Sequence, residues 1–153
     1  MMKMTNLFGK ILFVCIIMSS QAAFAQDPSG QAAALQNVPS GKVVMAWYSA
    51  WVNKDWNLLT QTVADGFTFS SPLDDHISLS AVKERCWPNA ALIKKFDVVS
   101  FAVDGDHAFV ISNGWTTEGK LARNTDYFIV KDGKIKAYEC YFGPGISFPL
   151  SGK

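Results

Sequence analysis

Two side chains of this sequence could carry acid–base chemistry, the carboxyl group of Asp126 and the imidazole of His76. Alternation along a strand-like run puts Asp126 on the same face as Asn124 and Phe128. A carboxyl group enclosed among aromatic side chains loses hydration, which raises its pKa and lets it exchange a proton near neutrality. His76 follows two adjacent aspartates, and a histidine beside an acid can act as a general base. These patterns predict Asp126 and His76 as catalytic candidates.

Both candidates also have a purely structural interpretation. Asp126 could accept hydrogen bonds in a buried polar network without taking part in a reaction. His76 could be a solvated residue of a polar loop. Cys86 and Cys140 leave a similar choice open, because two cysteines can form a disulfide in an oxidising compartment or stay buried as two thiols.

Other reaction classes have no support in the sequence. The histidines and cysteines are too widely separated to resemble a zinc site. Neither a glycine-rich phosphate loop nor a Gly-x-Ser-x-Gly motif occurs. We therefore expect no metal and no cofactor.

The N-terminal segment is typical of an exported protein. Lys3 and Lys10 precede the apolar run Ile11–Met18, and Ala23-Phe24-Ala25 resembles a signal-peptidase site. We expect a signal peptide over residues 1–25, a flexible lead-in over residues 26–37, and a periplasmic or secreted product. Because the leader holds two lysines and no acid, its removal changes the formal charge from +1 to −1. This charge argues against nucleic-acid binding, and we expect no membrane attachment after cleavage.

The remaining chain alternates helical and strand-like patterns in a fixed order. Apolar residues at three-and-four spacing predict a helix from Pro39 through Trp51, and Asp55 is placed to cap a second helix running to Val63. A third helix is expected from Ser78 or Ser80 to Cys86, where Pro88 would end it. A short strand is predicted over 67–71; it stops at Pro72 and is followed by a polar loop to Ser78. Four more strands, separated by turn residues, are predicted at 97–103, 107–116, 120–130 and 134–142.

Helices followed by strands indicate an α+β domain, with three N-terminal helices packed on one face of a curved antiparallel sheet. The composition, 49% hydrophobic in 153 residues, suits a single core. We place the domain at residues 38–143 and a C-terminal tail at 144–153.

Several segments resemble the nuclear transport factor 2-like superfamily, in particular its SnoaL-like and ketosteroid isomerase-like branches. The resemblance covers residues 38–143 and rests on Asn53-Lys54-Asp55, Phe67-Thr68-Phe69-Ser70-Ser71-Pro72, Asp126-Tyr127-Phe128, Asp132-Gly133-Lys134-Ile135 and Tyr141-Phe142-Gly143. It implies a conical fold that encloses a pocket for a small apolar or aromatic molecule. Under this resemblance the face carrying Asn124, Asp126 and Phe128 points into the pocket.

The resemblance to ketosteroid isomerase-like members is incomplete at the reacting groups. Ser71 occupies the position of their base carboxylate, before the proline that ends the first strand. Their helical tyrosine donor falls on Trp47, with Tyr48 turned about 100° away. Asp126 matches the acid of the penultimate strand. Steroid-type isomerisation is therefore not expected.

The sequence thus leads to two hypotheses of different classes. The first is an exported SnoaL-like protein that binds a small apolar or aromatic molecule, with cofactor-free acid–base activity of the isomerase, dehydratase or hydrolase type. Its expected ligand-binding residues are Trp47, Ser71, Trp87, Trp115, Asn124, Phe128, Tyr138 and Phe142. The alternative is a non-catalytic homodimeric association module with a vestigial pocket, in which Ile129, Ile135 and Tyr141 are exposed on the outer face of the sheet.

Overall fold

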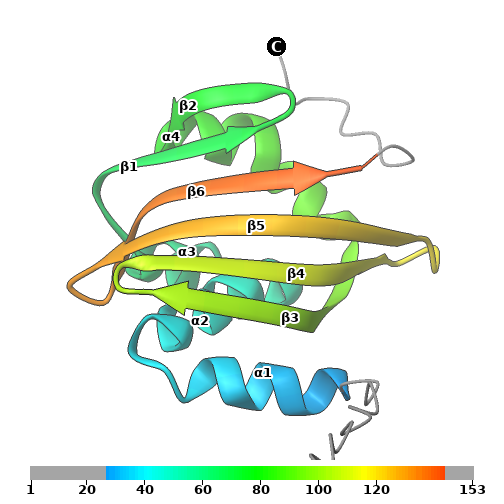
Figure 1. Cartoon of the computed structure of the whole chain (residues 1–153). Coiled ribbons are helices and arrows are strands. Elements are labelled where there is room, and N and C mark those ends of the chain that lie inside the picture. Colours follow the sequence, from blue (N-terminus) through cyan, green and yellow to red (C-terminus); the bar gives the residue numbers. More distant parts are fainter. Residues whose placement is uncertain (1–26, 144–153) are drawn as a thin grey trace, which may run out of the picture.

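The computed structural model describes residues 27–143, so the expected signal peptide and C-terminal tail lie outside the described residues. The helical elements are α1 (Pro28–Gln36), α2 (Pro39–Asn53), α3 (Trp56–Thr62), α4 (Leu79–Ala81), a π-helical turn η1 (Val82–Cys86) and a 3₁₀ helix η2 (Trp87–Leu92). The strands are β1 (Val63–Ser71), β2 (Asp74–Ser78), β3 (Ile93–Asp104), β4 (His107–Thr116), β5 (Leu121–Lys131) and β6 (Lys134–Phe142). The α+β class is confirmed: helices cover one face of a curved, open sheet (Figure 1).

The junction between α2 and α3 follows from local backbone chemistry. Lys54 adopts a left-handed conformation, and its backbone N–H caps α2 by donating to the last turn of that helix. The next residue, Asp55, caps α3 by accepting a hydrogen bond from the backbone N–H of Leu58 at 2.9 Å. The predicted cap is therefore confirmed. The tight corner sets α2 against the sheet.

The six strands are ordered β2-β1-β6-β5-β4-β3. All neighbouring pairs are antiparallel except β1 and β6, which run parallel. The predicted antiparallel meander of the last four strands is confirmed, and the parallel pairing of β1 with β6 is the departure from the predicted antiparallel sheet. Strands β1 and β6 are separated in sequence by the segment from β2 to β5, and β6 returns to lie beside β1 at the end of the domain. Their parallel pairing therefore cannot be made by a local turn.

Extra residues in β3 and β6 bend the sheet and change which side chains face inward. The β5–β6 register shifts where Ile129 pairs with Ala137 and Val130 pairs with Ile135, so Lys136 is the extra residue. One extra residue reverses the alternation, and Ile135 consequently faces the core and is fully buried. Its predicted place on the outer face was wrong.

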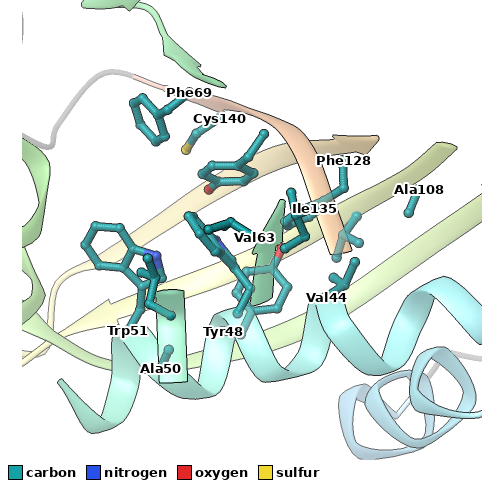
Figure 2. Packing of buried hydrophobic residues seen from close by; sticks show 14 of the residues in the cluster. Val44, Tyr48, Ala50, Trp51, Val63, Phe69, Ala108, Phe128, Ile135 and Cys140 are labelled. Carbon is teal, nitrogen blue, oxygen red and sulfur yellow. The ribbon is translucent and has the colours of Figure 1, made fainter. Parts of the chain in front are cut away.

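The core fills the space between α2 and the concave side of the sheet. Val44, Tyr48 and Trp51 project from α2 toward Phe128 and Cys140 of the sheet (Figure 2). Contacts between aromatic rings dominate this layer: the ring of Trp47 lies 4.9 Å from that of Tyr138, 5.6 Å from Phe67 and 6.0 Å from Trp51.

The segment over residues 26–37 is not a flexible lead-in, because Pro28–Gln36 forms helix α1. Leu35 is fully buried, and α1 lies along β3 (Figure 1). The turn into α2 brings Gly41 against α1 so closely that a Cβ there would sit 1.7 Å from the carbonyl oxygen of Leu35. Small polar residues suggested disorder, but Leu35, the partly buried Ala32 and the contact with Gly41 dock the helix.

The connection between β1 and β3 also differs from the prediction. The expected polar loop before Ser78 contains strand β2, which pairs with β1. Ser78, one of the two predicted helix starts, caps the following helix by accepting a hydrogen bond from the backbone N–H of Ala81. Pro88 does not end the helical segment, since it occupies the first turn of η2, where a missing N–H costs nothing. None of the helices within residues 27–143 is long and apolar enough to cross a membrane.

Candidate functional site

A largely apolar pocket opens between α2, η2 and the inner face of the sheet. Its cavity volume is about 80 Å³, and the wider atom-free space around the cavity, which includes open solvent, is about 570 Å³. The lining residues are Trp47, Tyr48, Trp51, Phe69, Ser71, Cys86, Asn89, Ile93, Phe96, Asn124, Tyr138, Cys140 and Phe142. Its aromatic walls with few polar groups are typical of a site for a small organic molecule.

Asp126 lies behind this pocket at the centre of a buried hydrogen-bond network. Tyr48 donates its hydroxyl to Oδ2 at 2.6 Å, and Tyr138 donates to Oδ1 at 2.8 Å. Ser112, from β4, donates to Oδ2 at 3.0 Å. The carboxyl group is fully buried and does not reach the pocket surface. The two tyrosines do line the pocket, so they stand between a bound molecule and the carboxylate.

Burial is the largest influence on the ionisable groups here. It raises the pKa of Asp126 above 3.8, while the hydrogen bonds from Tyr48, Tyr138 and Ser112 oppose that rise. Burial, followed by repulsion from the Asp126 carboxylate, raises the pKa of Tyr48 and of Tyr138 well above 10. The same two causes raise the pKa of Cys140 well above 9. The hydroxyls of Tyr48 and Tyr138 and the thiol of Cys140 therefore keep their protons at neutral pH.

Tyr48 is the residue that sequence reasoning missed. It was expected to turn away from the pocket, yet it supplies the shortest hydrogen bond to Asp126. The signal was present in the sequence: Val44, Tyr48 and Trp51 follow the spacing of one helical face, which is wide enough to include both Trp47 and Tyr48.

His76 is not brought together with Asp126. Its side chain is 69% exposed, and its Nδ1 lies 2.5 Å from Oδ1 of Asp75, which is itself exposed. Together with Glu139 and Tyr141 it borders a second, polar hollow beside the β1–β2 hairpin. The geometry matches the alternative interpretation of His76, a solvated rim residue.

The structure places five of the eight expected ligand-binding residues on the pocket wall: Trp47, Ser71, Asn124, Tyr138 and Phe142. Phe128 is fully buried behind Tyr48 and Tyr138. Trp87 packs on Trp51, with its ring centroid 4.9 Å away, outside the pocket lining.

Trp115 was also expected in the pocket, but it lies on the other face of the sheet. Its indole N–H donates to Asp97 Oδ2 at 2.9 Å, and the ammonium of Lys95 lies 5.4 Å from its ring centroid. The pocket gains Phe69, Phe96, Ile93 and Asn89 in its place. These residues lie on η2 and on strands β1 and β3, whose approach to α2 is set by tertiary structure.

No disulfide joins Cys86 and Cys140, which are both buried thiols at the pocket wall. The thiol of Cys86 lies 3.8 Å from Oδ2 of Asp74. Asp74 also forms a partly buried ion pair with Arg85 and accepts a hydrogen bond from Ser71 at 3.4 Å. This second network fixes the β1–β2 hairpin, and Ser71, which also lines the pocket, accepts hydrogen bonds from the backbone N–H groups of Leu73 and Asp74 in its turn.

Among residues 27–143, no three histidine, cysteine or acidic side chains are arranged to hold a metal ion. The polar groups on the pocket wall are two tyrosine hydroxyls, the Ser71 hydroxyl, two asparagine amides, the Trp51 indole N–H and two thiols, with the occluded carboxylate behind them.

Comparisons with known proteins agree with this fold. The sequence pattern of the SnoaL-like domain matches residues 44–138. A search of curated proteins returned no match.

Solved structures from several bacteria are similar at low sequence identity. A proposed polyketide cyclase from Sinorhizobium meliloti is 23% identical, with a TM-score of 0.53, and the match covers 65% of this chain and 93% of that protein. A proposed ketosteroid isomerase from Kribbella flavida is 14% identical, with a TM-score of 0.59, covering 72% and 82%. An LEH-like epoxide hydrolase from M. tuberculosis is 14% identical, with a TM-score of 0.57, and the match covers 69% of this chain and 83% of that protein. At these identities the likeness shows the fold alone.

Proposed function

The chain belongs to the SnoaL-like domain family, and from this premise we propose that it is an exported protein that binds one small, largely apolar or aromatic molecule. The observation that supports this proposal most is the aromatic-walled pocket between α2 and the sheet. Similar structures include proteins named as a cyclase, an isomerase and an epoxide hydrolase. One fold thus serves several reactions, and the reaction has to be argued from the site.

The acid–base chemistry we assign to this pocket runs through tyrosine. Because Asp126 is fully buried, a bound molecule reaches it only through the hydroxyl of Tyr48 or Tyr138. A proton accepted by the carboxylate would thus be relayed by a hydroxyl that holds its own proton at neutral pH. Cofactor-free isomerisation, dehydration or hydrolysis with weak proton transfer fits this arrangement.

Binding is tested with a matched pair of phenylalanine variants on opposite faces of the sheet. Phe142 lines the pocket, and Phe109 is exposed on the outer face. We expect small aromatic compounds to raise the melting temperature of the wild type and of Phe109→Ala. Phe142→Ala should lose most of this shift. A panel of lipophilic compounds that shifts none of the three proteins would refute the binding proposal.

Export is tested separately by expression of the full chain in a Gram-negative host. The mature protein should appear in the periplasmic fraction with an N-terminus at Gln26. A full-length product retained in the cytoplasm would contradict it.

A second candidate function is homodimerisation through the outer face of the sheet. One observation supports it. Phe109, Ile111 and Tyr141 are 46%, 39% and 55% exposed, and the ring of Phe109 stacks on Tyr127 at 4.7 Å. We call these four residues the outer patch. Contiguous apolar side chains on an open sheet face are typical of protein interfaces.

Light scattering on a size-exclusion column tests the dimer. We expect a dimer at micromolar concentration, and Ile111→Lys should convert it to a monomer. Leu92→Lys is the matched control, because Leu92 is equally exposed but lies on η2. A monomeric wild type would exclude the association module. Asp126→Asn separates the two functions, since it should alter turnover or ligand binding while leaving the dimer mass unchanged.

A further inference from the structure

The pocket has an unusual balance of hydrogen-bond donors and acceptors, which follows from where its hydroxyl protons go. A tyrosine hydroxyl has one proton to donate. Tyr48 and Tyr138 both direct that proton at Asp126, at 2.6 and 2.8 Å. Ser112 directs its own proton at the same carboxylate. The two pocket tyrosines therefore have no proton left for a bound molecule.

In its ionised form Asp126 can only accept hydrogen bonds, and all three neighbouring hydroxyls then donate to it. Asp126 accepts hydrogen bonds at both of its oxygens, and a protonated acid would need one of these oxygens to act as a donor. With the carboxylate as acceptor, Tyr48 and Tyr138 turn only oxygen lone pairs toward the pocket. They act as acceptors there, which is opposite to the role of a hydroxyl that stabilises a developing oxyanion.

Asn124 adds a further acceptor. It lies two residues before Asp126 on the same face of β5 and lines the pocket. Its side-chain oxygen is buried and has no hydrogen-bond partner within the described part of the chain. Buried carbonyl groups in folded proteins are nearly always paired, so this oxygen is suited to a ligand that carries a proton.

One buried donor of the pocket wall is also unpaired among the described residues. Trp51 lines the pocket, and its buried indole N–H also lacks a partner among residues 27–143. None of the residues that line the pocket is a lysine or an arginine. An anionic molecule would therefore enter an apolar cavity beside a buried carboxylate, without a counter-charge.

We infer that the molecule bound here is a neutral aromatic compound that carries an N–H or O–H donor, which it directs at Asn124 and the two tyrosine oxygens. The inference rests on the proposed binding function and specifies the class of ligand for the same pocket. It excludes carboxylates, and it disfavours compounds whose polar atoms only accept hydrogen bonds.

Indole and benzofuran test this directly, because they share one bicyclic shape and differ in a ring N–H against a ring oxygen. Each compound is titrated into the purified wild-type protein at pH 8 by isothermal calorimetry. We expect indole to bind at least tenfold more tightly than benzofuran. Naphthalene-2-carboxylate, an anion of similar size, should not bind.

Two leucine variants assign the preference to the pocket wall. Asn124→Leu removes the unpaired oxygen and should lower indole affinity about tenfold while leaving benzofuran affinity unchanged. Asn113→Leu is the matched control on the neighbouring strand, where Asn113 pairs with Arg123 on the outer face. It should change neither affinity. The wild-type comparison decides the ligand class even if a variant fails to fold.

The outcomes separate the two proposals. If indole and benzofuran bind equally, or benzofuran binds more tightly, the ligand class is wrong while the binding function stands. If neither of these two compounds binds, nor any other aromatic compound, both proposals are overturned. An indole preference that survives in Asn124→Leu would overturn the assignment to Asn124.

Discussion

Removing the hydroxyl of Tyr48 is the sharpest test of the buried network. The Tyr48→Phe substitution keeps the ring, whose centroid lies 5.0 Å from that of Phe96, and deletes one donor to Asp126. The hydrogen bond is 2.6 Å long, which is within the range of charge-assisted O–H···O⁻ contacts. Such bonds contribute about 1.5–3 kcal/mol, and full burial prevents water from replacing the lost donor. We therefore expect a loss of about 2 kcal/mol in the free energy of unfolding, or roughly 8 °C in melting temperature.

The assay is urea unfolding at pH 8, followed by tryptophan fluorescence. Tyr127→Phe is the matched control, since Tyr127 bonds to His107 at 2.6 Å on the exposed face of the same sheet and should cost less than about 0.5 kcal/mol. In a double-mutant cycle with Asp126→Asn, Tyr48→Phe should cost at least about 1 kcal/mol less than in the wild type. A Tyr48→Phe protein as stable as the Tyr127→Phe control would refute the idea that Tyr48 stabilises the carboxylate.

Three further predictions concern the same framework. Burial raises the pKa of Asp126 above its unfolded value, so the folded protein holds a proton on this group at a pH where the unfolded protein has lost it. The stability of the wild type relative to Asp126→Asn should therefore be greatest below about pH 4 and should fall as pH rises through the folded pKa. Urea unfolding midpoints of both proteins at several pH values measure this difference. Gly41→Ala places a Cβ 1.7 Å from a backbone oxygen of α1 and should cost about 3 kcal/mol or more, whereas Gly30→Ala, with nothing within 4 Å, should cost nothing measurable by thermal unfolding. Cys86 and Cys140 should resist iodoacetamide in the native protein and react only after denaturation, with no mass change on reduction; fast native alkylation would contradict their burial.

The local parts of this fold could be predicted from sequence because neighbouring residues determine them. Helix α2 follows from its apolar spacing, and the cap of α3 from Asp55. The β5–β6 turn follows from Asp132-Gly133, which both adopt positive φ. The strands 107–116 and 134–142 match their predicted bounds.

The remaining features depend on long-range contacts. The parallel pairing of β1 with β6 joins strands at opposite ends of the domain. The extra residue at Lys136 has no signature in the alternation of β6, yet it decides that Ile135 faces inward. By residue type alone, His76 and Asp126 were both predicted as catalytic residues. Tertiary structure distinguishes them, because the imidazole of His76 is exposed and the carboxyl group of Asp126 is buried.

Helix α1 has a consequence for the solubility of the protein. Strand β3 is an edge strand of the sheet, twelve residues long, and one of its two long sides has no strand partner. A bare strand of this length can recruit other chains and seed aggregation. Here α1 lies along β3 (Figure 1). Lys94 and Lys95 add exposed positive charge near the start of β3. Cleavage after Ala25 would leave α1 whole, whereas a protein shortened to begin at Val38 would expose this strand and precipitate more readily.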